Sequence, residues 1–504
     1  MQQKGIAMSL SRALSNKASM LPYLEKRLAY IGGQWCMAAG NATFDVKNPA
    51  NGEYLGSVAN VGESEAQEAV LKADKAFHLW KKTTVKERCF VMKEWYRLLM
   101  KNQEDIARLI TLEAGKPIAQ ARGEIAYGGS FIDWFAEEAK RVYGDVIPTH
   151  VAGRRLLVVK EACGVAALWV PWNFPLAMLT RKAAPAMAAG CSVICKPSEE
   201  SPYTALALAQ LAEEAGIPAG VFNVLPCSRN KSPEVTDVIM DSDLVTNFSF
   251  TGSTETGQLM LEKCAKTVKK ASMELGGNAA FIVFHSADVD TAARNAAASK
   301  FRNTGQACVA TNRILVQDAV YDEFVTKFVE NVGKLTIADG MNEESEIGPL
   351  INERAVEKVE RHVSNAKQLG AKVMCGGKRS NIGGTFYEPT VLANATNEMS
   401  VSQEETFGPI APVIRFKTEQ EAVQMANGTK YGLAGYIFTQ NISQAWRVME
   451  ALNVGMVGVN EGLISTEGAL FGGVKQSGIG REGSKYGIEE FIETKYVCLG
   501  GISP

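Results

Sequence analysis

The sequence predicts an α/β protein built from two successive units, each with a largely parallel sheet. Short apolar runs alternate with helical segments from about residue 165 to 275, and the alternation restarts near residue 279. Such alternation is typical of strand–helix–strand units, whose strands run parallel to one another. A chain of 504 residues is also long enough for two or three domains with sizeable cores.

The predicted elements follow from hydrophobic periodicity, in chain order. Helical spacing of apolar residues predicts helices over 63–112 and 123–142. In the first unit, strands are predicted at 165–170, 192–195, 221–225, 245–250 and in a run ending near 275, with helices that include 176–189 and 201–215. In the second unit, strands at 280–284 and 314–317 alternate with helices at 288–301 and 320–332, and a last strand is predicted over 491–498.

Charge and cysteine usage limit the classes of partner. The chain has 53 basic and 55 acidic residues, for a formal net charge of −2, which offers no general attraction to nucleic acid or to an anionic membrane. No apolar run approaches the roughly 20 residues that a membrane-spanning helix needs. The 10 cysteines are scattered without zinc-binding spacing, which is typical of reduced thiols in an intracellular protein.

The amino-terminal segment has the composition of a targeting peptide. It contains Lys4, Arg12 and Lys17 and has no acidic residue before Glu25. This is typical of a mitochondrial presequence and predicts the mitochondrial matrix, with a basic leader on a cytoplasmic protein as the alternative. Residues 1–27 are therefore separated from the fold as a leader.

Two reactive side chains are candidates for catalysis. Cys308 lies in a polar loop beyond Gly305, where a predicted helix ends. A cysteine thiolate can add to an aldehyde carbonyl, and the thioester that remains after loss of hydride is open to attack by water. Glu274 precedes two glycines, and a carboxylate whose pKa is raised by burial can take a proton from that water. Taken alone, these residues also fit an inert loop cysteine and a solvated turn acid.

A turn bounded by two prolines, at 171–175, follows the first strand of the alternating region. Ligand sites of parallel sheets form at such strand ends. The side-chain amide of Asn173 is a candidate donor to a developing oxyanion, and Trp172 is a candidate to pack against a ligand. A purely structural proline turn is the alternative.

Two other segments suit a dinucleotide. Lys196, Pro197, Ser198 and Glu199 follow the second strand, where lysine and glutamate can bind ribose hydroxyls; Glu199 favours NAD over NADP because it would repel the extra phosphate. The loop that opens the helix after 245–250 offers backbone N–H groups to a pyrophosphate, and its residues are Gly252, Ser253, Thr254, Glu255, Thr256 and Gly257. A surface ion pair and a simple helix cap are the respective alternatives. A G-x-G-x-x-G match at 478–483 follows polar residues rather than a strand, so it is assigned to a loop.

Together, and in this order, these motifs resemble the aldehyde dehydrogenase superfamily. The segments 404–409 and 471–473 extend a resemblance that covers nearly all of the chain after residue 28. It implies a Rossmann-type cofactor domain at 28–143 and 163–274, a second α/β catalytic domain at 275–488, and a small β oligomerisation element at 144–162 and 489–504. It also implies NAD, with NADP less favoured, and a homo-oligomer, with a tetramer favoured.

The resemblance implies roles for individual residues. Cys308 would be the nucleophile and Glu274 the general base, while the Asn173 side chain and the Cys308 backbone N–H would hold the oxyanion. Lys182 would assist proton transfer. Glu405 matches the position that holds the nicotinamide ribose, and Trp172 and Phe407 complete the implied cofactor site.

The segments 299–306, 458–465 and 480–487 resemble the branch of this family that oxidises succinic semialdehyde in animal mitochondria. By this match, Arg181, Arg302 and Ser465 would bind the substrate carboxylate, which arginine holds through two parallel hydrogen bonds. Surface ion pairs are the alternative for these arginines. The expected reaction is NAD-dependent oxidation of succinic semialdehyde to succinate. The alternatives are another acidic or general aldehyde, such as glutaric semialdehyde, and a non-enzymatic role on the same scaffold.

Three residues depart from the family pattern. Ala310 stands where relatives have a second cysteine, so a vicinal disulfide with Cys308 is not available. Leu470 replaces the usual proline beside Glu467, which would oppose an anionic substrate if it pointed inward. Ser198 stands where NAD-preferring relatives often have alanine.

Overall fold

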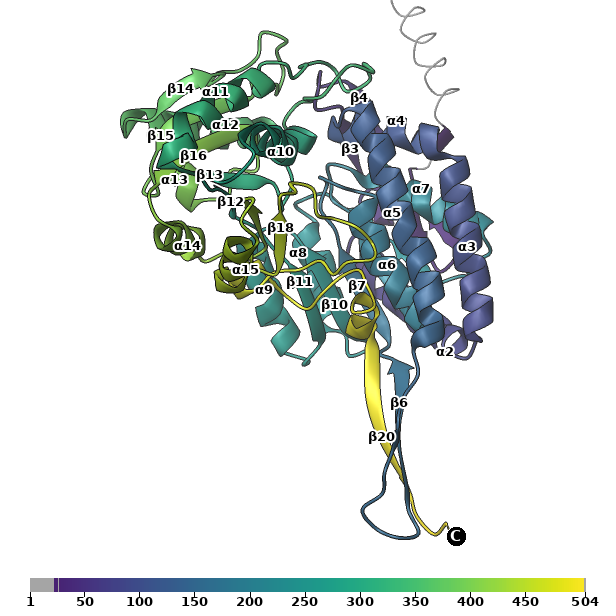
Figure 1. The fold of residues 1–504 in the computed structure, drawn as a ribbon. Helices are drawn as coiled ribbons and strands as arrows, with labels where there is room; N and C mark the ends of the chain where they lie inside the picture. Colours follow the sequence, from purple (N-terminus) through teal and green to yellow (C-terminus); the bar gives the residue numbers. More distant parts are fainter. Residues whose placement is uncertain (1–21, 26, 503–504) are drawn as a thin grey trace, which may run out of the picture.

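The computed structural model describes residues 22–25 and 27–502, which form two helix-covered sheets and a projecting β element (Figure 1). Most of the predicted leader, residues 1–21 and 26, lies outside the described residues. Residues 22–25 form a short 3-10 helix, η1 (Pro22–Glu25), and its Tyr23 is buried in the core of the first unit.

The first sheet has the strand order β19-β11-β10-β7-β8-β9-β1-β2. Its five central strands run parallel, and the three outer strands pair antiparallel. The bounds are β1 (Ala29–Ile31), β2 (Gln34–Cys36), β7 (Val165–Trp169), β8 (Ser192–Lys196), β9 (Phe222–Val224), β10 (Val245–Thr251), β11 (Lys270–Glu274) and β19 (Gly478–Ile479). The alternation predicted from sequence is thus confirmed for this unit.

The loop predicted at 478–483 needs a correction, because its first two residues form the edge strand β19. Gly478 pairs with Glu274 and Ile479 with Met273. The pairing partner lies about two hundred positions earlier in the chain, so no local pattern of residues 478–483 indicates a strand. The consequence is that this segment lies beside Glu274.

Helices cover both faces of the first sheet because successive strand side chains point to opposite sides. Ala166 and Leu168 of β7 face one core, whereas Val165 and Ala167 face the other. The first core includes α3 (Val85–Lys101), α4 (Gln103–Ala114), α5 (Ile118–Glu138), α6 (Ala177–Ala189) and α7 (Pro202–Glu214), and the second includes α2 (Glu63–Trp80), α8 (Ser232–Asp241) and α9 (Thr254–Ala265). The helices predicted over 63–112 are therefore confirmed as α2, α3 and α4.

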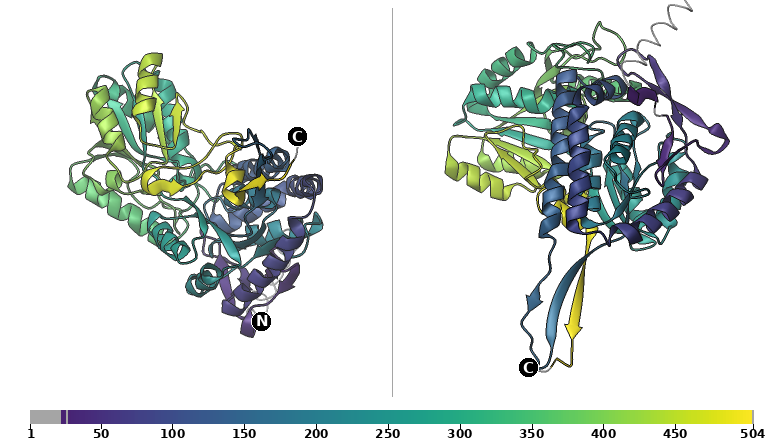
Figure 2. Two further views of the ribbon diagram at one scale, coloured as in Figure 1. Left: turned by 90° about the horizontal axis from the view of Figure 1, so that it is seen from below. Right: turned by 90° about the vertical axis from the view of Figure 1, so that its right-hand side faces the viewer.

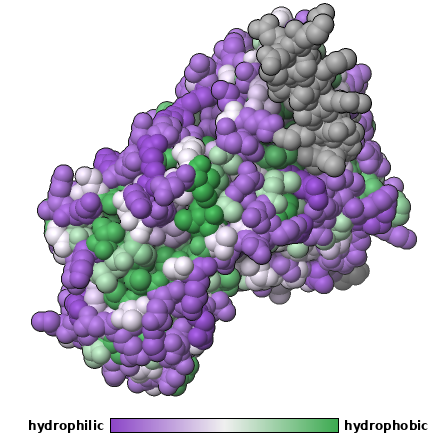
Figure 3. Space-filling model, turned by 90° about the horizontal axis from the view of Figure 1, so that it is seen from above, coloured by the Kyte–Doolittle hydropathy of each residue, from purple (hydrophilic) through white to green (hydrophobic). Residues whose placement is uncertain are grey.

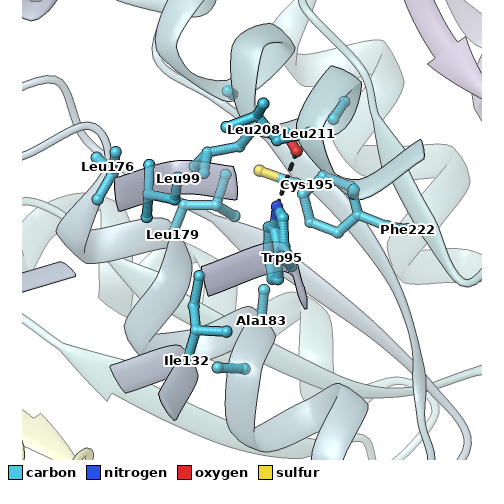
Figure 4. Close-up of a cluster of buried hydrophobic side chains, with 14 of the residues drawn as sticks. Trp95, Leu99, Ile132, Leu176, Leu179, Ala183, Cys195, Leu208, Leu211 and Phe222 are labelled. Atoms are coloured by element: carbon cyan, nitrogen blue, oxygen red, sulfur yellow. Dashed lines mark hydrogen bonds between the residues drawn. The ribbon is translucent and has the colours of Figure 1, made fainter. Parts of the chain in front are cut away.

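One face of α6 is anchored in the larger of these cores (Figure 4). Leu176, Leu179 and Ala183 point into a cluster around Trp95 of α3. The indole of Trp95 packs edge-on against Phe222, with ring centroids 5.5 Å apart, and its Nε1 donates to the carbonyl oxygen of Leu208 at 3.1 Å. The position of α6 is therefore set by packing against several other elements.

The second sheet has the order β14-β15-β16-β13-β12-β17-β18 and is parallel except for the edge strand β14. Its strands are β12 (Ala279–Val283), β13 (Thr311–Gln317), β14 (Lys372–Cys375), β15 (Thr390–Ala395), β16 (Ile410–Phe416), β17 (Ala434–Phe438) and β18 (Met456–Val459). The core on one face includes α10 (Val289–Phe301) and α11 (Tyr321–Val332), and the core on the other includes α12 (Glu353–Gln368), α13 (Ser400–Gln403), α14 (Glu419–Asn427) and α15 (Ile442–Ala451).

Three antiparallel strands project from the body of the molecule (Figures 1 and 2). They are β5 (Val146–Ile147), β6 (Arg155–Ala162) and β20 (Ile492–Leu499), in the order β20-β6-β5. The final strand predicted from sequence is thus confirmed, and it pairs with β6 along its whole length. A separate hairpin joins β3 (Thr43–Lys47) and β4 (Tyr54–Ala59).

The face seen from above is hydrophilic around its rim, with hydrophobic side chains gathered toward its middle (Figure 3). Within residues 22–25 and 27–502, no helix combines the length and apolar character that crossing a membrane requires. The same residues contain no group of three or more His, Cys, Asp or Glu side chains placed to hold a metal ion.

Candidate active site

The cofactor candidates lie at the carboxyl ends of neighbouring parallel strands. The chain leaves the central strand β7 toward β8 and β9 on one side and returns to β10 and β11 on the other. Sheets of this kind bind ligands where the strand order reverses. Trp172 follows β7, Lys196–Glu199 closes and follows β8, and Gly252 follows β10, so the structure brings these predicted segments to one edge.

The groups at this edge fit a dinucleotide. No ion pair joins Lys196 to Glu199, both of which are described residues, so the surface ion pair considered above is not formed. Ser253 caps α9 by accepting from the backbone N–H of Thr256 at 3.3 Å. The buried hydroxyl of Thr251 has no hydrogen-bond partner in the described structure. A nicotinamide cofactor bound here would supply the acceptor for a hydride.

Glu405 and Phe407 bring the second unit to the same region. Oε1 of Glu405 accepts from the backbone N–H of Gly277 at 2.8 Å, and burial raises the pKa of Glu405 to about 7. Phe407 lies in the left-handed region, with φ of 54°, and its ring is edge-on to Trp172 with centroids 5.7 Å apart. Two distant predicted segments therefore contact each other.

Cys308 lines a pocket that has about 520 Å³ of empty space, open solvent included. Pockets whose walls are largely apolar with a few polar groups suit small organic ligands. Its walls come from both units and from the segment before β19, and they are Tyr127, Phe174, Met178, Arg181, Ser299, Arg302, Ala307, Cys308, Val309, Ala310, Tyr436, Gly462, Leu463, Ile464, Ser465 and Phe471. The structure thus brings Cys308 together with Arg181, Arg302 and Ser465.

The loop that carries Cys308 is held in an unusual backbone conformation. Asn303 and Thr304 have φ angles of 49° and 58°, which are costly for side chains other than glycine. Asn173 donates from Nδ2 to the carbonyl oxygen of Gln306 at 3.1 Å, so the predicted oxyanion donor lies beside this loop. A Cβ on Gly277 would lie 2.3 Å from the carbonyl oxygen of Cys308, which explains why the turn after Glu274 needs glycine.

Glu274 is buried, with 2% of its surface exposed, and neither carboxylate oxygen has a hydrogen-bond partner among the described residues. Burial, followed by the nearby charge of Glu482, raises the pKa of Glu274 well above its usual range. The same physical effect acts on the nucleophile, because burial raises the pKa of the Cys308 thiol to about 12 although Arg181 partly offsets it. The charge of Glu274 also raises the pKa of Cys308, so the thiol and the unpaired buried carboxylate lie near enough to interact.

Sequence reasoning missed Glu482. This buried carboxylate forms ion pairs with both Arg181 and Lys182. Burial disfavours its charged form, but the two cations outweigh that effect and hold the pKa of Glu482 below its usual range. Glu482 lies between the glycines of the 478–483 segment, but no local pattern indicates that it pairs with two cations about three hundred positions earlier in the chain.

The remaining predicted residues have distinct surroundings. Lys182 donates from Nζ to Ser249 at 3.1 Å and does not line the pocket, whereas the Arg181 guanidinium lies 4.0 Å from the ring centroid of Phe471.

Glu467 accepts from Thr466 at 3.0 Å and Ser130 at 3.2 Å, and it is not part of the pocket wall. Glu467 therefore does not place its negative charge in the wall of the pocket, where it would repel an anionic substrate.

Comparisons with known proteins agree with this geometry. Residues 35–497 match the model of the aldehyde dehydrogenase family. The chain is 56% identical to the mitochondrial succinate-semialdehyde dehydrogenase of Mus musculus, over 94% of this chain and 90% of that protein. It is 52% identical to the NADP(+) succinate-semialdehyde dehydrogenase of Escherichia coli, over 95% and 98%.

Solved structures are similarly close. A succinate-semialdehyde dehydrogenase from Burkholderia pseudomallei superposes with a TM-score of 0.93 at 50% identity, covering 96% of this chain and 98% of that one. A betaine aldehyde dehydrogenase from Staphylococcus aureus in complex with NAD+ gives 0.93 at 35% identity, with 97% of each chain covered. The chain therefore belongs to the aldehyde dehydrogenase family, whose members are NAD(P)-dependent oxidoreductases.

Proposed function

We propose that this protein oxidises succinic semialdehyde to succinate, with NAD as the preferred cofactor. The observation that carries the proposal is that Arg181, Arg302 and Ser465 line the same pocket as Cys308. Within the described residues, Arg302 has no carboxylate partner, so its guanidinium is free to take a substrate carboxylate through two hydrogen bonds. The succinate-semialdehyde dehydrogenases among the relatives support the same substrate.

The proposed chemistry runs through Cys308. The thiol gives up its proton to solvent as its sulfur bonds to the aldehyde carbon, and the oxygen of the resulting thiohemiacetal is held by the Asn173 amide and the Cys308 backbone N–H. A nicotinamide cofactor bound at the strand ends would accept the hydride from that carbon, and a thioester remains. Glu274 takes a proton from water, the hydroxide attacks the thioester carbon, and cleavage of the C–S bond releases the acid and restores the thiol.

The preference for NAD rests on Glu199. This half-buried carboxylate follows β8 and is not neutralised by Lys196, so it would repel the additional phosphate of NADP. The E. coli relative is named for NADP(+), so the comparison of cofactors is an essential arm of the test. Glu199→Gln should narrow the difference in kcat/KM between the two cofactors.

The decisive experiment compares succinic semialdehyde, glutaric semialdehyde and propanal with both cofactors, by NADH or NADPH absorbance. Arg302→Ala should lower kcat/KM for the acidic aldehydes roughly tenfold to hundredfold, the loss of a charge-assisted hydrogen bond of about 1.5–3 kcal/mol, and leave propanal nearly unchanged. Arg97→Ala, which removes an exposed arginine of α3 paired with Glu94, is the matched control. Equal losses for all three aldehydes would refute the carboxylate assignment.

The location and assembly belong to the same proposal. The Mus musculus and Homo sapiens relatives are named mitochondrial, which supports the mitochondrial matrix for this chain. Fusion of residues 1–27 to a fluorescent protein tests this, because a diffuse cytoplasmic signal would contradict import through this segment. We place the domain boundaries at 28–143 and 163–274, 275–488, and 144–162 and 489–504, with the last pair mediating assembly into a tetramer.

A further inference from the structure

A buried ion pair outside the pocket contacts the start of α6. Lys116 and Glu124 have no exposed side-chain surface and pair with each other. Oε1 of Glu124 also accepts from the backbone N–H of Leu176 at 2.9 Å and of Ala177 at 3.3 Å. These are free N–H groups of the first helical turn, where a carboxylate is favoured by both hydrogen bonding and the helix dipole.

The close approach of α5 to α6 makes these contacts possible. Gly128 lies one turn after Glu124 on α5, and a Cβ there would lie 2.2 Å from the Leu176 side chain and 3.0 Å from Cα of Ala177. The glycine thus lets the backbone of α6 come near enough for Glu124 to reach its amides. Glu124 and Gly128 therefore define the start of α6 together.

Lys116 extends the pair into the pocket wall. Its Nζ lies 3.6 Å from the ring centroid of Phe174, and the guanidinium of Arg302 lies 5.1 Å from the same centroid. A cation held against an aromatic ring is attracted by its π electrons, more strongly when it is desolvated. Phe174 lines the pocket beside Cys308, so the orientation of this wall depends on Lys116.

We propose that Lys116 and Glu124 form a positioning pair that orients the oxyanion donor Asn173, the pocket wall Phe174 and the substrate-binding Arg181. Asn173 and Phe174 lie shortly before Leu176, whose backbone amide Glu124 holds, and Arg181 follows in the second turn of α6. One face of α6, with Leu179 and Ala183, is anchored in the Trp95 cluster (Figure 4). A shift of about 1 Å in such groups can cost about a hundredfold in rate.

The test compares Glu124→Gln and Glu124→Asp with Glu113→Gln. Glu113 is a matched control because it is equally buried and caps α7, accepting from the backbone N–H groups of Tyr203 at 2.8 Å and Thr204 at 2.9 Å. No residue of α7 lines the pocket. Steady-state kinetics at saturating cofactor and thermal unfolding are measured for each variant, with succinic semialdehyde and propanal as substrates.

We expect the Glu124 variants to lower kcat about tenfold or more for both aldehydes, because Asn173 serves both, and to raise KM for the acidic aldehyde alone, because Arg181 serves only that one. Glu113→Gln should lower Tm with kcat unchanged.

A loss of Tm with unchanged kcat in both Glu124 variants would overturn the proposal and leave the pair a structural cap. Loss of kcat in Glu113→Gln equal to that in the Glu124 variants would overturn it as well. If Glu124→Gln does not fold, Glu124→Asp, which keeps the charge but shortens its reach, decides the question. The role given to Arg181 rests on the proposed substrate. If the unmodified enzyme oxidises propanal but not the semialdehydes, that substrate is refuted. The effect of the Glu124 variants on kcat for propanal still tests the positioning pair.

Discussion

At the scale of single residues, the site buries several ionisable side chains, and burial makes their charged forms unfavourable. Glu274 has no hydrogen-bond partner, while Glu482 close by is neutralised by Arg181 and Lys182. Two buried carboxylates in one region cannot both ionise freely unless cations compensate one of them. The arrangement divides their roles: Glu482 remains charged, and Glu274 keeps the raised pKa that suits a base.

The first prediction concerns the pH dependence of turnover. A raised pKa keeps Glu274 protonated, and inactive as a base, to a higher pH than an ordinary glutamate; kcat should therefore rise as the pH rises through that pKa and fall on acidification. The pH profile of kcat for acyl-enzyme hydrolysis measures this. Glu274→Gln should remove that limb and slow hydrolysis while an initial burst of NADH persists. An acid limb near 4.3, about the value of an unperturbed glutamate, would contradict the interpretation.

At the scale of elements, the glycine-rich segments 276–277 and 471–473 lie against Cys308 and Glu274 respectively. Gly277 passes under the carbonyl of Cys308, and a Cβ on Gly472, whose φ is 154°, would lie 2.9 Å from Oε1 of Glu274. Both segments therefore allow backbone to approach the reacting groups closely. The motifs at 276–277 and 471–473 are explained by this packing.

We predict that Gly277→Ala lowers kcat by roughly a hundredfold, because its Cβ would collide with the Cys308 carbonyl and displace the nucleophile. Rates of Cys308 alkylation by iodoacetamide and kcat should fall together, with near-normal circular dichroism. Gly500→Ala, at a position where an added Cβ meets nothing, is the control. Unchanged kinetics in Gly277→Ala would show that the loop yields to the methyl group.

The catalytic loop also determines the response to oxidants. Ala310 lines the pocket two positions after Cys308, and no other cysteine lines it. Peroxide should therefore inactivate the enzyme by oxidising Cys308, with recovery by dithiothreitol lost once the sulfinic acid forms. Ala310→Cys should make inactivation reversible through a disulfide. A disulfide of Cys308 in the oxidised, unmodified enzyme, detected by mass spectrometry of its peptides, would show that a cysteine elsewhere reaches Cys308.

At the scale of the whole molecule, the projecting sheet is the part of the chain whose apolar side chains are left uncovered in the monomer. Val146 is 78% exposed and Leu499 is 42% exposed, and the strand register places both side chains on the same face of this sheet. Apolar side chains exposed together indicate a protein contact surface. We predict that Val146→Asp reduces the assembly measured by light scattering, whereas Leu71→Asp, at a 64% exposed leucine of α2 outside this sheet, does not. An unchanged mass would exclude β5 from the interface.

The sequence by itself determined the alternation of strands and helices, the order of the motifs and the identity of Cys308 and Glu274 as candidates. Each of these depends on local periodicity or on residues close together in the chain. Only the tertiary structure decided which groups share the pocket. Glu482 reaches Arg181 across about three hundred positions, and β19 exists because β11 offers it an edge. Neither contact has a local signal, because long-range pairing depends on how the units pack.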